Sequence, residues 1–225
     1  MLGQAIGELL PSAVGVALSP VPIVAVILML GTPKAKVNGP AFAAGWVLGL
    51  TAVSVLVLVV TGGADDTTSG TSDTVDVVVT LFGVLLLAVA WKQWTSRPEP
   101  GTEAQMPKWM NAVDHFTPVR SFAIGVTLSA INPKNLALTL SAATSIAQAG
   151  LSAVGDAEAI AVFVILGSLT VAGPVIAYLI LGERIAPALD RAKAFMAQNN
   201  AVIMAVVCLI LGAKLVGSGI GGLSD

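Results

Sequence analysis

The chain has 225 residues, of which 56% are hydrophobic and only 11% are charged, and its formal net charge is −2. Soluble globular proteins carry roughly 25% charged residues, so this composition excludes an ordinary water-soluble domain. The single cysteine, Cys208, excludes an intramolecular disulfide and a thiolate metal cluster, and one histidine adds too few ligands for a dedicated metal site. We therefore expect an integral membrane protein without a metal or other cofactor.

Several apolar stretches are long enough to cross a hydrocarbon core about 30 Å thick, which takes roughly 20 helical residues. They lack the alternation of apolar and polar residues that β-barrel strands show, so helices are favoured. Lys92 and Lys214 lie near the ends of their stretches, whereas Lys134 lies well inside its own. The six predicted membrane-spanning helices are Leu9 to Pro33, Ala41 to Val60, Val77 to Trp94, Ser121 to Gly155, Ala159 to Gly182 and Ala194 to Val216.

The connections between these helices alternate in charge. The first, third and fifth connections, with Lys92 at the end of the third helix counted in, hold nine of the 11 Lys and Arg residues, whereas the second and fourth hold acidic residues and no basic ones. Short basic loops are retained in the cytoplasm. We therefore expect a multi-pass protein of the cell (inner) membrane with cytoplasmic basic loops, acidic loops outside and both termini extracytoplasmic.

The longest connection divides the chain into two halves. Residues 1–94 form the first predicted three-helix repeat, residues 95–117 a cytoplasmic linker, and residues 118–225 the second three-helix repeat. After Pro107, Trp109, Met110, Val113 and Phe116 recur at helical spacing, which predicts a short amphipathic helix at the cytoplasmic interface.

The two halves contain similar segments. Gly15-Val16-Ala17-Leu18-Ser19-Pro20 resembles Gly125-Val126-Thr127-Leu128-Ser129-Ala130, and each segment leads into a proline-containing interruption of an apolar run. A repeat of three helices, an odd number, enters the membrane the second time from the opposite face. The sequence therefore predicts an all-α protein built from two inverted three-helix repeats, as in secondary transporters.

Prolines are expected to break the first and fourth helices. Ser19-Pro20-Val21-Pro22 and Asn132-Pro133-Lys134-Asn135 place prolines inside apolar runs, where each removes a backbone donor and clashes with the preceding turn. Unpaired backbone at membrane depth is tolerated where it lines a cavity or is covered by protein. Two facing breaks would enclose a central site, although two ordinary proline kinks are the simpler interpretation.

Lys134 is the most informative residue, because it lies about 24 Å along a helix counted from Pro118, where an ammonium group is costly to hold. No carboxylate lies at matching depth, so an anionic substrate group is a candidate partner; a lysine that snorkels to the interface is the alternative. Glu8 is a candidate for carrying a coupling proton, unless it is simply solvated. The predicted substrate-binding residues are Lys134, Asn132, Pro133, Asn135, Ser129, Ser19, Pro20 and Pro22.

Several motifs of the chain resemble the sulfolipid-addressing, or peptidoglycolipid-addressing, protein family of actinobacteria, which belongs to the lysine-exporter superfamily. These motifs are Pro107-Lys108-Trp109-Met110, Arg120, Gly125, Leu128-Ser129 and Asn132-Pro133-Lys134-Asn135. The resemblance implies an exporter that helps bring an envelope glycolipid, or its anionic head group, to the cell surface, alongside larger lipid-export machinery. It also implies a site at the facing breaks. The Asn-Pro-Lys triplet is shared across the superfamily and does not specify the substrate.

Two other functions stay open. Relatives in the superfamily export amino acids or other small polar solutes, and an accessory scaffold of a lipid-export complex would transport nothing itself. We expect no enzyme and no catalytic residues, because neither a Ser/His pair nor two carboxylates fall at comparable depth. The expected partners are membrane lipids, the substrate, lipid-export machinery and a second copy in a homodimer, and no nucleic acid.

Overall fold

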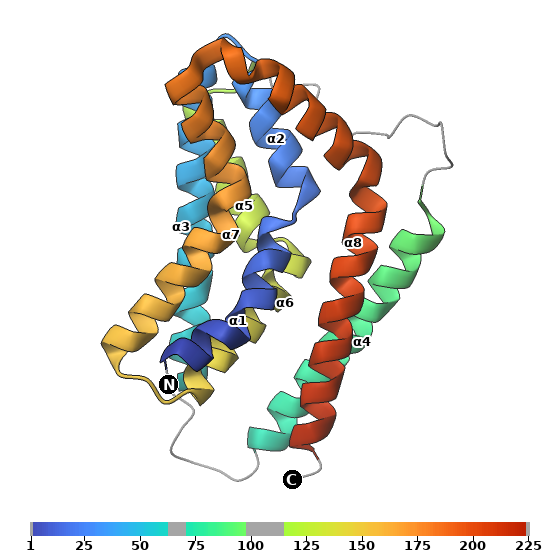
Figure 1. Ribbon diagram of the computed structural model, residues 1–225. Coiled ribbons are helices and arrows are strands. Elements are labelled where there is room, and N and C mark those ends of the chain that lie inside the picture. Colours follow the sequence, from blue (N-terminus) through green and yellow to red (C-terminus); the bar gives the residue numbers. More distant parts are fainter. Residues whose placement is uncertain (1, 63–70, 98–114, 224–225) are drawn as a thin grey trace.

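The computed structural model describes residues 2–62, 71–97 and 115–223, and every regular element within them is a helix (Figure 1). Most of the amphipathic helix predicted after Pro107 lies outside the described residues. The elements are α1 (Leu2–Ala17), α2 (Pro20–Leu30), α3 (Ala35–Gly62), α4 (Thr71–Thr95), α5 (Pro118–Ala130), α6 (Pro133–Gln148), α7 (Ala153–Leu181), the short 3₁₀ helix η2 (Gly182–Ile185) and α8 (Ala186–Gly222).

The helices are apolar enough to identify a membrane protein. Among the described residues, 35–60 and 153–222 are long and apolar enough to cross a membrane, and α1 with α2 adds a third candidate if this bent pair is one span. Large side chains such as Val59, Ile180 and Ile210 stay more than half exposed on the outside of the bundle. An outer surface of this kind is suited to lipid and not to water.

Several helix boundaries differ from the sequence-based prediction. The boundary predicted between the fourth helix, which was to end at Gly155, and the fifth, which was to begin at Ala159, is wrong, because α7 already begins at Ala153. The Ser152 side chain caps it by accepting a 3.3 Å hydrogen bond from the Gly155 N–H. Asp156 lies in the first turn, where a carboxylate favours the helix dipole. An apolar run can therefore miss the first turn of a helix, because a capped polar turn precedes the apolar residues.

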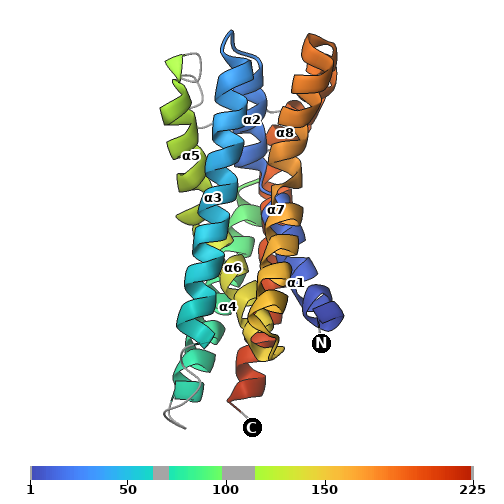
Figure 2. The same cartoon turned by 90° about the vertical axis from the view of Figure 1, so that its left-hand side faces the viewer.

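Both chain termini lie at one end of the bundle, together with the α6–α7 connection, while the α2–α3 and α7–α8 connections lie at the other end (Figures 1 and 2). The α2–α3 connection carries Lys34, and η2 carries Arg184. The end of the molecule opposite the termini is therefore a basic end.

Small residues bring some helices very close together. A Cβ atom added at Gly45 of α3 would overlap the carbonyl oxygen of Phe122 of α5, and one added at Gly125 would overlap the carbonyl oxygen of Phe42. Gly83 of α4 and Gly212 of α8 approach each other in the same way. Because lipid is as apolar as these side chains, such close backbone packing holds membrane helices together where hydrophobic burial cannot.

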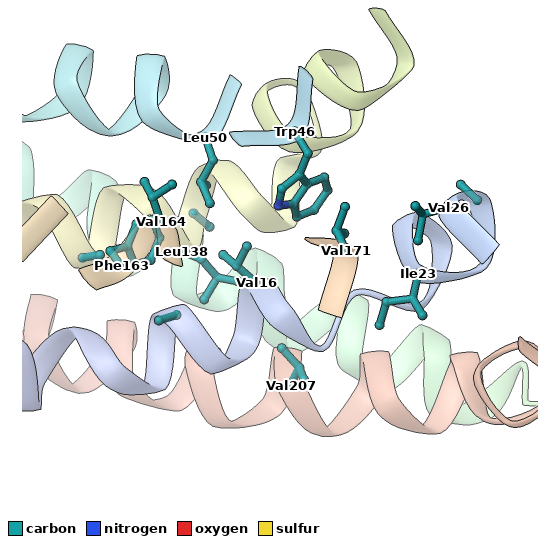
Figure 3. Close-up of a cluster of buried hydrophobic side chains, with 14 of the residues drawn as sticks. Val16, Ile23, Val26, Trp46, Leu50, Leu138, Phe163, Val164, Val171 and Val207 are labelled. Carbon is teal, nitrogen blue, oxygen red and sulfur yellow. The ribbon is translucent and has the colours of Figure 1, made fainter. Parts of the chain in front are cut away.

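The buried core lies where helices from both halves of the chain meet. Val16 of α1, Leu50 of α3 and Leu138 of α6 are at most 1% exposed and gather beside the link between α1 and α2 (Figure 3). Trp46 of α3 and Val171 of α7 lie close by and are also buried. This packing surrounds the point where the first apolar run is interrupted.

Candidate functional site

Two interruptions of the helical backbone define the candidate site. α1 ends at Ala17 and α2 begins at Pro20, with a bend of 52° between them. α5 ends at Ala130 and α6 begins at Pro133. Both prolines occupy the first position of the second half-helix, where a missing N–H costs nothing.

The last carbonyl groups of α1 are satisfied by side chains. The final carbonyls of an α-helix have no partner within the helix. Here the Gly15 carbonyl accepts a 2.8 Å hydrogen bond from Lys134 Nζ, the Val16 carbonyl a 2.7 Å bond from Ser19 Oγ, and the Ala17 carbonyl a 2.6 Å bond from Thr170 Oγ1. The interruption is therefore covered by side chains from α6, α7 and the link itself.

Lys134 lies in the first turn of α6 and is 4% exposed. Its backbone N–H donates to the side chain of Asn132, which caps the helix at 3.0 Å. Its ammonium group donates to the Gly15 carbonyl and also to Ser19 Oγ. The carbonyl end of a helix carries partial negative charge, so the end of α1 favours this cation.

No carboxylate neutralises that ammonium group within the part of the chain that the structure describes. The ion pair found there, between Lys193 and Asp190, lies on the exposed first turns of α8. Cys208 of α8, which is fully buried, lies within electrostatic range of Lys134. Lys134 is thus held by neutral acceptors, which an anionic group can replace.

Asn135 links the two interruptions. It is fully buried, and its side-chain NH₂ donates a 3.0 Å hydrogen bond to the Leu128 carbonyl near the end of α5. Its Oδ1 atom lies 3.4 Å from Ser19 Oγ, which belongs to the other interruption. Lys134, Asn135 and Ser19 therefore form one connected polar cluster, with Asn132 as the cap of α6.

The remaining predicted residues lie outside this cluster. Ser129 bonds to the Val126 carbonyl of its own helix and packs against Gly49 of α3. Pro133 is exposed, whereas Pro20 and Pro22 are buried in the first turn of α2. Glu8 is exposed, and its carboxylate accepts a 3.2 Å bond from Gln4, away from Lys134.

Sequence reasoning missed Thr170 and several other buried polar groups. Among the buried side chains with a polar atom that lacks a hydrogen-bond partner, four lie inside the predicted apolar runs on α1, α3, α6 and α7 and are each at most 4% exposed. Such atoms are uncommon inside proteins and are available to water or to a ligand. Hydroxyl groups and an indole inside apolar runs were the only signal, and spacing does not show which way they point. They are Ser12 of α1, Trp46 of α3, Thr139 of α6 and Ser168 of α7.

A metal centre is not formed by the described residues, where no three His, Cys, Asp or Glu side chains come together. The arrangement is instead that of a helical membrane protein with a polar cluster, centred on one lysine, at two interrupted helices. A family model described as "Sap, sulfolipid-1-addressing protein" matches residues 9–221. The chain therefore belongs to the sulfolipid-1-addressing protein family, which confirms the resemblance drawn from its motifs. Among curated proteins and among solved structures, no match to the chain is found.

Proposed function

We propose that this chain is a transporter that moves an envelope lipid, or its anionic head group, from the cell membrane toward the cell surface. The family description concerns the addressing of a sulfolipid, which supports a lipid-related role at the membrane. The observation that carries the proposal is the Lys134 ammonium group, which is buried and bonded to the Gly15 carbonyl and Ser19 without a carboxylate among the described residues.

The energetics of Lys134 favour an exchangeable partner. An ammonium group within a membrane is expensive, and such residues usually face a pathway or a ligand. A carbonyl and a hydroxyl accept two of its three N–H donors and leave its charge uncompensated. A sulfate, phosphate or carboxylate of a substrate would form stronger, charge-assisted bonds with the same ammonium group. Binding would free the end of α1 and couple occupancy to movement of the half-helices.

The helix contacts support an inverted repeat of two three-helix units, residues 1–94 and 118–225. In such a repeat α1 and α2 correspond to α5 and α6, α3 to α7, and α4 to α8. α1 packs on α7 as α5 packs on α3, and both α2 and α6 contact α3 and α7. α4 and α8, the third helices of the two units, pack on each other. We infer six membrane crossings and alternating access by rocking of one unit against the other.

The orientation follows from the charge distribution. The basic end carries Lys34 and Arg184, and short basic loops are retained in the cytoplasm. We place that end inside the cell and the two termini outside. Transport toward the termini then corresponds to export.

The decisive experiment compares two lysine substitutions in purified protein reconstituted into liposomes. Lys134→Met removes the charge at nearly constant volume. Lys214→Met is the matched control, because Lys214 also bonds to a carbonyl of α1, that of Glu8 at 3.2 Å, but lies outside the cluster. Lys134→Met should reduce lipid flux by about 10-fold to 100-fold, the effect of one charge-assisted bond.

Any of three results would contradict the proposal. Unchanged flux in Lys134→Met, with the protein folded and present in the membrane, would remove Lys134 from the mechanism. No flux with the unsubstituted protein alone would favour the accessory-scaffold alternative. An amino-acid flux that exceeds the lipid flux would favour the small-solute exporter.

A further inference from the structure

A long groove lies between α3 and α7, the two helices seen side by side in Figure 2. Its volume is about 570 Å³. The two helices are in contact at Leu50 and Gly167, where a Cβ atom added to the glycine would lie 3.2 Å from the leucine side chain. The groove lies between this contact and the start of α7, because its lining on α7 comes from residues 153–165.

The walls of the groove are almost entirely apolar. Val55 and Leu58 contribute from α3, and Ile160 and Val164 from α7. Along α7 the lining runs from residue 153 to residue 165, which is about 18 Å at 1.5 Å per residue. A groove with apolar walls over about this length fits a hydrocarbon chain better than a compact polar solute.

The two ends of the groove differ. At the end near the start of α7, Asp156 is half-buried in the lining, and no Lys or Arg among the described residues lines the groove. Beyond the other end of the lining, Gly167 of α7 lies against Leu50 and against Val16, whose carbonyl accepts the Ser19 hydrogen bond. The groove therefore lies between an acidic mouth and the residues that pack beside the polar cluster.

We propose that this groove binds one acyl chain of a lipid whose head group presents hydroxyl groups, such as those of a sugar, to Asp156. A carboxylate accepts hydrogen bonds from hydroxyl groups and repels anionic oxygens. A lipid that carries both a sugar and an anionic group therefore orients its hydroxyl groups toward this mouth. The assignment of this lipid as substrate rests on the proposed transport function; its binding in the groove does not.

The test uses the full-length protein in lipid nanodiscs and two photoactivatable lipids with identical acyl chains, a glucosyl diacylglycerol and phosphatidic acid. Labelled peptides are identified by mass spectrometry. Val55→Trp fills the groove, whereas Val59→Trp adds the same bulk one turn further along α3, at a residue that is also exposed and does not line the groove. Asp156→Asn removes the charge at the mouth, with Glu158→Gln as its control.

The groove peptides of α3 and α7 should be labelled by the glucosyl lipid more than by phosphatidic acid. Val55→Trp should lower this labelling by roughly tenfold, since excluding two methylene groups from an apolar site weakens binding by about that factor. Asp156→Asn should reduce the preference for the glucosyl lipid. Val59→Trp and Glu158→Gln should leave labelling and preference unchanged.

Labelling that also spreads evenly over the outer faces of α4 and α8 would mean general lipid contact and would overturn the proposal. Equal effects of Val55→Trp and Val59→Trp on the labelling of the groove peptides would overturn it as well. Equal labelling by both lipids, unaffected by Asp156→Asn, would overturn the assignment of the head group. Lys134→Met should reduce flux and leave groove labelling intact. Failure of the transport function and failure of the groove are thus separate results.

Discussion

The ammonium group of Lys134 donates a 2.8 Å hydrogen bond to the carbonyl oxygen of Gly15, which lies 119 positions earlier in the chain. This bond joins the start of α6 to the end of α1. Thr170 of α7 satisfies the Ala17 carbonyl at the same interruption. The first interrupted helix is therefore completed by side chains from the second half of the protein.

Ser19→Ala should destabilise the protein by about 1–3 kcal/mol, because the buried Val16 carbonyl loses its partner and Lys134 loses an acceptor. Ser54→Ala is a matched control. Ser54 is also 3% exposed, but it donates to the Leu50 carbonyl inside a continuous helix, which keeps its backbone partner. The free energy of unfolding in detergent measures both, and equal losses would argue against a special role for the interruption.

Gly45→Ala should destabilise the protein by about 1–3 kcal/mol or more, because its methyl group would overlap the Phe122 backbone and push α3 and α5 apart. Gly173→Ala, in the interior of α7 with no atom near the added methyl, should be neutral or stabilising by up to about 1 kcal/mol. Thermal unfolding of the two purified variants distinguishes them. A neutral Gly45→Ala would mean that the helices are not in close contact.

Cys208 should react slowly with N-ethylmaleimide, since its thiol is fully buried in α8 and is reached only when the protein opens. A Ser218→Cys variant in a Cys208→Ser background, at an exposed position near the end of the same helix, should react at least roughly tenfold faster. If the half-helices move during transport, a transported lipid should accelerate the labelling of Cys208. Lipid-independent rates would count against such movement.

The orientation of the chain can be measured by cysteine labelling in intact cells. In a Cys208→Ser background, a membrane-impermeant maleimide should label Gly7→Cys, near the termini, and spare Glu183→Cys, at the basic end. Both positions are exposed, so accessibility to water does not separate them. The reverse pattern would place the termini in the cytoplasm and would turn the proposed direction of transport around.

Composition and apolar runs were enough to predict a helical membrane protein, because the cost of burying charge in lipid is visible in the sequence itself. Helix ends were predicted less well. α7 begins at Ala153 because Ser152 caps it, and a cap depends on side-chain geometry that hydropathy does not register. The interruption before Pro133 was indicated by the proline and by Asn132, whose side chain caps α6.

The candidate site was predicted in part. A lysine in a long apolar run marked Lys134, and neighbouring polar residues marked Ser19 and Asn135, which the structure brings into one cluster. Thr170 could not be assigned, because nothing in its own segment shows that its hydroxyl reaches the end of α1. Ser129 was expected in the site and instead packs against Gly49 of α3.

The sequence by itself determined that the helices of this protein are suited to a membrane, where they are interrupted, and that Lys134 lies at one interruption. Each of these features follows from the local cost of a charge or of a proline. Only the tertiary structure decided which carbonyl groups that cation and its neighbours satisfy, and where α3 and α7 separate into a groove. Those features depend on contacts between helices far apart in the chain, and no local pattern encodes the direction in which a side chain meets another helix.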